Sequence, residues 1–419
     1  MEAARLFAIL NNESLNLIEC ESEARGLSDD QVRKGKRAGD SAMSYPYLNQ
    51  TLPTPDPMAS EYTAQSFRPL LNKLVQTPEY FSADDLKQAL NHLFTPDILH
   101  PAQIGAFLTA LHIHRVERRP ESLAAAASVL RARALKASVQ DAEGDFVVDI
   151  VGTGGDGYNL FNVSTTAAVV AAGAGARVIK HGSRASTSSS GSADLLESLE
   201  CLFVAPTPGL PTPIPRIPFT FILAPHYHPA LAMIAPYRKS LPFRTMFNVL
   251  GPLINPACPR GMVLGVAERE IGQTFAHSLR EGGVERALVV CGFEGLDEIS
   301  CAGPTHAWEL KDGNVTATTL TPADFGLPAH PLTAVGGGGP QENAETFTTL
   351  LTSGENIPEK LVPVLDFVLM NASALLVVAG IAKDYKEGAQ LARESVTSGK
   401  AWEALSIFRD AGKSGVAFS

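Results

Sequence analysis

One stretch of the chain, residues 146–194, constrains the fold more than any other. It opens with Phe146-Val147-Val148-Asp149-Ile150-Val151, an apolar and β-branched run that predicts a buried strand. A turn rich in glycine follows at residues 152–157, and glycine lets such a turn take unusual dihedral angles and bring its N–H groups close to a ligand. An alanine-rich helix comes next, with Asn162 or Ser164 as its expected cap.

A second predicted strand, residues 177–180, ends in the polar loop His181-Gly182-Ser183-Arg184. Open α/β sheets bind ligands at the carboxyl ends of their strands, and a helix N-terminus presents free N–H donors to an anion. Two neighbouring loops rich in glycine, serine and basic residues therefore predict a pocket that binds an oxyanion, and phosphate is the expected ligand.

The glycine turn has three weaker interpretations. The G-x-G-x-x-G spacing that begins at Gly152 matches a dinucleotide-binding motif, which needs a helix at the third glycine and an acidic residue about 20 residues on. Here residues 158–163 delay the helix, and no Asp or Glu lies between Asp156 and Asp194. A Walker loop is excluded because no Gly-Lys-Ser/Thr follows the glycines. A purely structural role would explain one loop, but not two polar loops meeting across one βαβ unit.

Composition limits the class of protein. The 419 residues are 45% hydrophobic and 19% charged, which suits a soluble globular protein with room for two domains. We expect no membrane span and, because acidic residues come early in the chain, no secretory or transit peptide. Five scattered cysteines suit a reducing cytosol, and a net charge of −10 disfavours binding to duplex nucleic acid. The predicted localisation is cytoplasmic.

The chain divides into an extension and two domains. Residues 1–63 are predicted to be an N-terminal extension and linker, since four prolines crowd its last part. Residues 64–145 are predicted to form a helical domain, to which residues 225–257 return, and the α/β domain takes residues 146–224 and 258–419. Further expected elements are helices 83–93 (capped by Ser82), 101–115, 121–136, 271–281, 343–352, 373–383 and 387–398, strands 219–223, 262–266 and 287–291, and a surface loop at 206–218.

Six motifs stand out along the chain: GTGGD at 152–156, NVST at 162–165, KHGSR at 180–184, SGSAD at 190–194, RTMFNVLGPLINP at 244–256 and GLDE at 295–298. In order and spacing they resemble the motifs of the anthranilate phosphoribosyltransferases. The similarity runs from about Ser66 to near the C-terminus. It implies a small all-helical domain and a larger α/β domain with a mainly parallel central sheet, similar to nucleoside phosphorylases and phosphoribosyltransferases.

The resemblance implies an activity. Enzymes of this family transfer the 5-phosphoribosyl group from phosphoribosyl diphosphate to the amine of anthranilate, in tryptophan biosynthesis. Breaking the bond at the anomeric carbon builds positive charge on the sugar, while diphosphate leaves with negative charge. Backbone N–H groups of Gly154 and Gly155, with Mg²⁺, would stabilise the leaving group, and no covalent nucleophile is required. A homodimer through the helical domain is also implied.

The resemblance also carries over three sets of site residues. Phosphoribosyl diphosphate is expected at Gly152, Gly154, Gly155, Asp156, Asn162, Ser164, Thr165, Lys180 and Ser188. Anthranilate is expected at Gly152, His181, Ser183, His228, Arg238 and Pro252. Mg²⁺ is expected at Ser164, Asp297 and Glu298.

The chemistry of several of these residues fits the implied roles. Magnesium takes one or two carboxylates together with substrate phosphates and waters, which suits the pair Asp297-Glu298. Asp156 is either a ligand or a residue that fixes the turn through its side chain, and both roles stay open. Arg238 offers a planar fork to a carboxylate.

The sequence departs from the family pattern at two positions. Ser183 stands where Asn is usual, and Ser189 stands where Lys is usual. The first change affects a contact to the aromatic acid, and the second removes a cation for which Arg184 is the expected replacement.

Two other functions compete. A nucleoside phosphorylase has a similar plan, but the motifs at 180–182 and 244–256 favour the transferase. A non-catalytic, nucleic-acid-binding relative on the same scaffold would show basic stripes and lose the pair Asp297-Glu298, whereas this chain is acidic and keeps the pair.

Overall fold

The computed structural model describes residues 62–185 and 188–414. All of them belong to the unit Pro55–Ser419. Nearly all of the predicted extension and linker, residues 1–63, lies outside the described residues.

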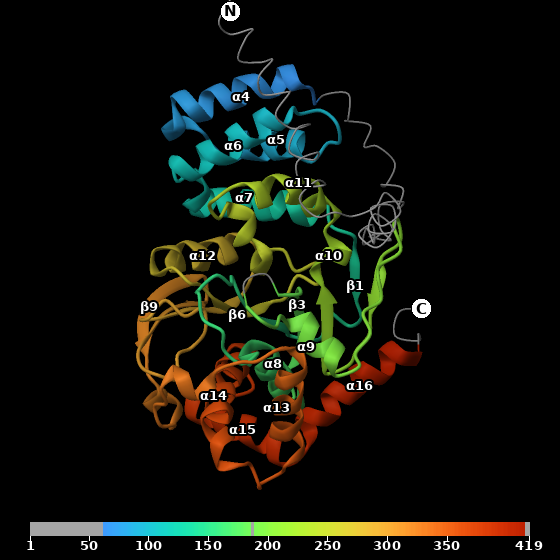
Figure 1. The fold of residues 1–419 in the computed structure, drawn as a ribbon, viewed down its shortest axis with the longest axis vertical. Coiled ribbons are helices and arrows are strands. Elements are labelled where there is room, and N and C mark those ends of the chain that lie inside the picture. The colour runs from blue at the N-terminus through green and yellow to red at the C-terminus, as the bar shows by residue number, and fades with distance from the viewer. Residues whose placement is uncertain (1–61, 186–187, 415–419) are drawn as a thin grey trace, which may run out of the picture. The chain divides into compact units, whose positions relative to one another are not determined.

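Four helices come first along the described chain: α4 (Ala64–Gln76), α5 (Ala83–Leu93), α6 (Pro101–Ile113) and α7 (Pro120–Ala132) (Figure 1). Ser82 caps α5 as predicted, because its side chain accepts a hydrogen bond from the N–H of Asp85 while the Asp85 carboxylate accepts from the N–H of Ser82. Helix α7 ends at Ala132, four residues before the predicted end, and α6 also ends early.

The α/β part is built on a seven-stranded sheet with the order β5-β3-β2-β6-β7-β8-β9. The first five strands pair in parallel, and the last two add an antiparallel edge, so the predicted fold class is confirmed. The antiparallel pair was not predicted. The strands are β2 (Val147–Gly152), β3 (Arg177–Gly182), β5 (Phe219–Leu223), β6 (Gly261–Gly265), β7 (Arg286–Gly292), β8 (Thr305–Lys311) and β9 (Asn314–Leu320).

Helices cover both faces of this sheet. Helices α8 (Val163–Gly173) and α14 (Val362–Ala379) pack against β2, and α12 (Arg269–Glu281) packs against β7 and β8 on the other face (Figure 1). The chain closes with α13 (Pro340–Thr352), α15 (Tyr385–Thr397) and α16 (Lys400–Ser414), of which α16 was not predicted.

Two sequence predictions about these regions were wrong. Helix α14 spans Val362–Ala379 and not 373–383, and the segment Glu359–Ala379 is apolar enough to cross a membrane. Its most apolar window is 78% buried inside the protein, as in a core helix. The predicted surface loop at 206–218 contains the strand β4 (Thr212–Ile214), which pairs in parallel with β1 (Ala137–Val139).

Residues 225–257 form α10 (Ala224–Tyr227), α11 (Pro229–Ser240) and two short 3-10 turns. Ile234 and Phe247 from this segment are buried in the same apolar core as Phe67 of the first helix. That core also reaches the sheet. The shared packing supports the proposal that this segment returns to the helical domain.

Candidate functional site

The glycine turn follows β2, at the carboxyl edge of the sheet. Gly154 and Gly155 have φ angles of 68° and 80°, in the left-handed region that favours glycine. The loop of Asp297 packs directly against the turn, since a Cβ added at Gly152 would lie 2.2 Å from Asp297 Oδ2. At Gly265, the neighbour of Gly152 in β6, a Cβ would lie 1.5 Å from the backbone oxygen of Asp297. Glycine at these positions therefore lets two loops from distant parts of the chain meet.

The predicted metal ligands come together on one side of this turn. Asp297 Oδ2 accepts a 2.6 Å hydrogen bond from the N–H of Gly154, so this N–H, expected to bind diphosphate, is already occupied. Burial and the nearby Asp156 raise the pKa of Asp297 to about 7. Burial and the charge of Asp297 raise the pKa of Glu298 well above its usual value, and Glu298 lies beside Lys180 and Ser164.

These oxygen donors fit Mg²⁺. Among the described residues, no three or more His, Cys, Asp or Glu side chains form a ready metal site. Magnesium is usually held by one or two carboxylates and completed by substrate phosphates and waters, so a site of two carboxylates and a hydroxyl is what such an ion requires. Asp156 Oδ1 accepts the N–H of Tyr158 at 3.1 Å, which favours the turn-fixing role for Asp156.

Helix α8 points its N-terminus toward this region, with Asn162 at the cap position. Asn162 is one of the two expected caps and takes the cap position, but its side chain makes no capping hydrogen bond. Its Nδ2 donates to the backbone oxygen of Ser190 at 2.9 Å, and its Oδ1 accepts from Asn343 Nδ2 at 2.8 Å. Asn162 thus ties the loop of Ser190 and helix α13 to the start of α8, and Asn343 is a site residue that the sequence did not indicate.

The first turn of α8 supplies backbone donors. The hydroxyl of Thr165 is buried and donates to Ser192 Oγ at 2.9 Å, so it is not available to a phosphate. The N–H groups of Ser164 and Thr165 belong to the first helical turn, where backbone donors lack intrahelical partners. A phosphate contact of Thr165 would therefore come from its backbone.

Lys180 is buried beneath the turn. Its Nζ donates to the backbone oxygen of Ile150 and lies 3.5 Å from Ser164 Oγ. Burial lowers the pKa of Lys180, while the neighbouring carboxylates oppose this shift. Burial also raises the pKa of Asp149 to about 6, and Asn255 Nδ2 donates to Asp149 Oδ2 at 2.9 Å. Asp149 and Asn255 were not predicted as site residues, and the buried charges of Asp149 and Lys180 act on each other.

His181 and His228 form an uncharged wall. Their rings meet edge to face, with centroids 5.1 Å apart. His181 Nδ1 donates to the backbone oxygen of Gly251 at 3.2 Å, and its Nε2 has no partner within the described part of the chain. Burial lowers the pKa of His181 well below its usual value and lowers that of His228 to about 4. Both rings are therefore neutral near pH 7.

Two arginines lie on the other side of the glycine turn. Arg238, in the last turn of α11, is half-buried, and burial and the charge of Arg244 lower its pKa. Arg244 donates through Nη2 to the backbone oxygens of Gly154 at 2.8 Å and Thr153 at 3.3 Å. No carboxylate described in the structure pairs with either guanidinium. Neighbouring cations without a counter-ion form a site for an anion.

The serine residues of the site are more exposed. Ser183 Oγ donates to the backbone oxygen of Arg184 at 3.0 Å, and Ser188 Oγ donates to that of Ser190 at 3.3 Å. Arg184, the expected replacement for the missing cation, pairs with Glu197 at the surface, and its contact with phosphate stays a prediction.

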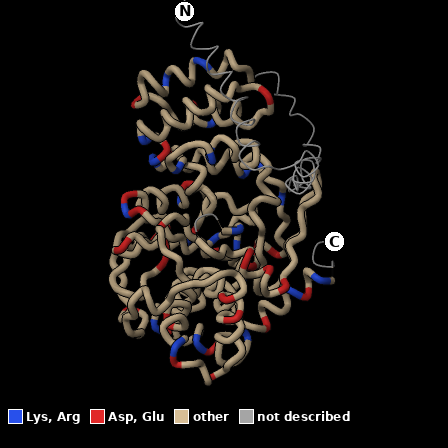
Figure 2. The backbone as a smooth tube through the Cα atoms, viewed as in Figure 1, with Lys and Arg blue, Asp and Glu red and all other residues tan. Residues whose placement is uncertain are grey.

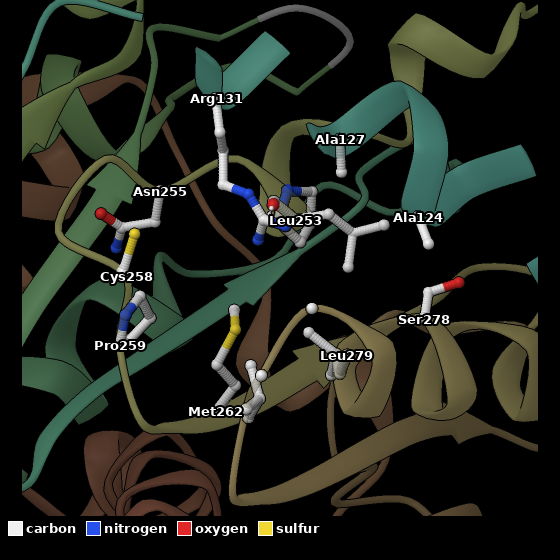
Figure 3. A pocket seen from close by; sticks show the side chains of 14 residues that line it. Ala124, Ala127, Arg131, Leu253, Asn255, Cys258, Pro259, Met262, Ser278 and Leu279 are labelled. Carbon is white, nitrogen blue, oxygen red and sulfur yellow. Dashed lines mark hydrogen bonds between the residues drawn. The ribbon is translucent and has the colours of Figure 1, made fainter. Parts of the chain in front are cut away.

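Pro252 borders a cavity that the other predicted site residues do not line. The cavity lies between α7 and α12. Pro252, Leu253, Arg131 and Met262 are among the residues that line it (Figure 3). The preceding residue, Gly251, accepts the hydrogen bond of His181, so the segment also touches the histidine wall. A contact of Pro252 with anthranilate stays a prediction.

Comparisons with known proteins agree with this geometry. Residues 144–402 match the "Glycosyl transferase family, a/b domain", and residues 68–134 match the "Glycosyl transferase family, helical bundle domain". A protein of Schizosaccharomyces pombe named anthranilate phosphoribosyltransferase is 45% identical over 309 residues, which is 74% of this chain and 86% of that protein. A Deinococcus radiodurans protein of the same name is 40% identical over 327 residues, covering 78% of this chain and 94% of the relative.

Solved structures are also similar. Anthranilate phosphoribosyltransferase from Saccharomyces cerevisiae in complex with PRPP and Mg has a TM-score of 0.76 and 33% identity, covering 84% of this chain and 99% of the other. The enzyme from Thermus thermophilus has a TM-score of 0.72 and 37% identity, covering 82% and 99% of the two chains. With its glycine turn, carboxylate pair and helical bundle, this chain belongs to the anthranilate phosphoribosyltransferases.

Proposed function

We propose that this chain transfers the 5-phosphoribosyl group from phosphoribosyl diphosphate to the amine of anthranilate. The products are N-(5-phosphoribosyl)anthranilate and diphosphate, in tryptophan biosynthesis. One observation carries the assignment to this site: the glycine turn has carboxylates on one side and, on the other, Arg244, which holds the turn, beside Arg238, which has no counter-ion among the described residues. The two sides suit a metal-bound diphosphate and an aromatic carboxylate.

The diphosphate end of the first substrate is assigned to the glycine turn and the start of α8. Asp297, Glu298 and Ser164 would hold Mg²⁺, which supplies positive charge to the leaving diphosphate. The N–H of Gly155 and the first-turn N–H groups of α8 provide further donors. Lys180 adds a cation from within the sheet, close to Ser164.

Anthranilate is assigned to the opposite side. Arg238 offers its carboxylate a bidentate partner, and the neutral rings of His181 and His228 offer a flat polar wall. The Nε2 of His181, which has no partner among the described residues, is an acceptor for the substrate amine, because Nδ1 already donates to Gly251. No covalent nucleophile is needed, since the amine itself attacks the sugar carbon as diphosphate leaves.

The test of the proposed function is the decay of anthranilate fluorescence. Purified protein, phosphoribosyl diphosphate and Mg²⁺ together should consume anthranilate, and omission of any one should stop the decay. A protein that leaves anthranilate unchanged but cleaves a nucleoside with inorganic phosphate would be a nucleoside phosphorylase, and the proposal would be withdrawn.

The rival function of a nucleic-acid-binding relative is disfavoured by the charge distribution. Lys and Arg are interspersed with Asp and Glu along the described chain (Figure 2). Electrophoretic mobility of labelled duplex DNA, unchanged by the protein at physiological salt, is the expected result.

Two further proposals concern the assembly and location of the protein. We propose a homodimer through the helical domain, whose helices α4 and α6 expose Val75 and Ile113 at 51% and 67%. Light scattering after size exclusion should give twice the mass of the chain. A cytoplasmic location is supported by four free cysteines in the described residues.

A further inference from the structure

Two side chains, Asp297 and Arg244, form hydrogen bonds with the peptide groups of the glycine turn from opposite sides. In a trans peptide the carbonyl of one residue and the N–H of the next point in opposite directions. The peptide joining Thr153 to Gly154 is tied at both ends, because its oxygen accepts from Arg244 and its N–H donates to Asp297. Its orientation is therefore fixed.

The next peptide, joining Gly154 to Gly155, is tied at one end only. Its oxygen accepts a 2.8 Å hydrogen bond from Arg244 Nη2, and the N–H of Gly155 has no partner among the residues described. Because both carbonyls face Arg244, both N–H groups face the opposite side, where Asp297 lies. Successive N–H groups that point the same way form an anion-binding concavity.

Arg244 lies close against this turn because Gly155 lacks a side chain. A Cβ on Gly155 would lie 1.9 Å from Arg244 Nη1. The two residues therefore fit each other, although 89 positions separate them in the chain (244 minus 155).

Arg244 is in turn anchored to the helical domain. The ring of the preceding Phe243 stacks on His112 of α6, with centroids 4.3 Å apart. Two residues further on, the N–H of Met246 donates to the buried Glu117 at 2.8 Å, and Glu117 also contacts His112 Nδ1 at 2.9 Å. The helical domain thus fixes the segment that carries Arg244.

We propose that Arg244 is a positioning residue: by holding the carbonyls of Thr153 and Gly154, it directs the N–H of Gly155 toward the diphosphate. This inference rests on the proposed function. It assigns Arg244 to the recognition of phosphoribosyl diphosphate, whereas the neighbouring Arg238 is assigned to anthranilate.

The test is Arg244→Ala, with each substrate varied in turn. Loss of a charge-assisted hydrogen bond that orients the donor should raise the Michaelis constant for phosphoribosyl diphosphate roughly tenfold or more, with less than about a threefold change for anthranilate. Arg244→Lys should recover only part, since Lys lacks the planar fork. An equal rise in both constants, or none, would overturn the inference.

Chemical rescue separates positioning from a general structural role. Guanidinium at millimolar concentration should restore part of the affinity of Arg244→Ala for phosphoribosyl diphosphate, because it can occupy the site beside Gly154. It should have no such effect on wild type. Arg260→Ala is the matched control, since Arg260 pairs with Glu285 near the surface at the opposite end of β6, and its constants should stay unchanged. A variant that guanidinium does not rescue would contradict the inference.

A binding measurement keeps this inference separate from the proposed function. Calorimetric titration with inorganic diphosphate and Mg²⁺ should show roughly tenfold weaker binding to Arg244→Ala than to wild type. If wild type binds diphosphate but does not consume anthranilate, the proposed function fails while the role of Arg244 is still measured. If wild type turns over and both proteins bind diphosphate equally, only the inference about Arg244 fails.

Discussion

Replacing Arg238 with alanine is expected to weaken the use of anthranilate and to leave that of phosphoribosyl diphosphate nearly unchanged. Arg238 is half-buried, and its Nε has no hydrogen-bond partner among the described residues. The positive charge of the neighbouring Arg244 repels it. The Arg238 guanidinium therefore has N–H donors free to bind a substrate carboxylate, because no described protein group accepts from its Nε. Binding of the carboxylate should therefore depend strongly on this side chain.

The size of the effect follows from the kind of bond that is lost. A hydrogen bond to a charged group is worth about 1.5–3 kcal/mol, and each 1.4 kcal/mol is about tenfold in affinity. Arg238→Ala should accordingly raise the Michaelis constant for anthranilate by roughly tenfold to a hundredfold. Arg238→Lys should recover part of the loss, because a point charge cannot reproduce the planar fork.

Stability gives a second measurement on the same variant. A half-buried guanidinium without a counter-ion costs desolvation free energy, so its removal should leave the melting temperature unchanged or slightly higher. Steady-state kinetics by anthranilate fluorescence, with each substrate varied in turn, and thermal denaturation together test the reasoning. If both Michaelis constants rise in parallel and the melting temperature falls by many degrees, Arg238 supports the fold and the carboxylate is held elsewhere.

Three other predictions follow from the site and the chain. Asp297→Asn should abolish turnover with little change in melting temperature, because an amide oxygen can still accept the N–H of Gly154; wild-type activity at saturating Mg²⁺ would contradict the metal assignment. Deleting residues 1–60 should leave activity and oligomeric state intact, and aggregation of the truncated chain on size exclusion would show a structural role. The pKa of His228 is about 4 in the folded protein, against an ordinary value of 6.5, so the native state should lose stability as pH falls through this range, by about 2 kcal/mol at pH 5. Urea unfolding at pH 7.5 and at pH 5 measures how much unfolding free energy is lost between the two pH values. His228→Gln should lose less than wild type, and equal losses in the two proteins would refute the low pKa of His228.

Much of the fold could be predicted from the sequence because the signals are local. Ser82 precedes an amphipathic segment and caps it, and the β-branched run before Gly152 forms a buried strand. Each of these signals lies within a few residues of the feature that it specifies. The glycine turn could be predicted in the same way, since three of its glycines take positive φ angles.

The elements that were missed lack such a signal. Helix α14 is buried on nearly all sides, so its sequence is apolar throughout and shows no helical period that marks its start. Strand β9 is mostly exposed and rich in threonine, without the alternation of a half-buried strand. Strand β4 is only three residues long, and its pairing with β1 joins segments more than 70 residues apart.

The candidate site shows the same division. Motifs within single segments located the glycine turn, the start of α8, Lys180 and the pair Asp297-Glu298. The bonds that make them one site join residues far apart in the chain: Gly154 to Asp297 across 143 positions, Asn162 to Asn343 across 181, and Gly154 to Arg244 across 90. A sequence pattern specifies local conformation and burial. Which side chain completes the hydrogen bonds of a distant peptide group is decided only when the sheet and helices pack, and this is why the role of Arg244 is visible in the tertiary structure alone.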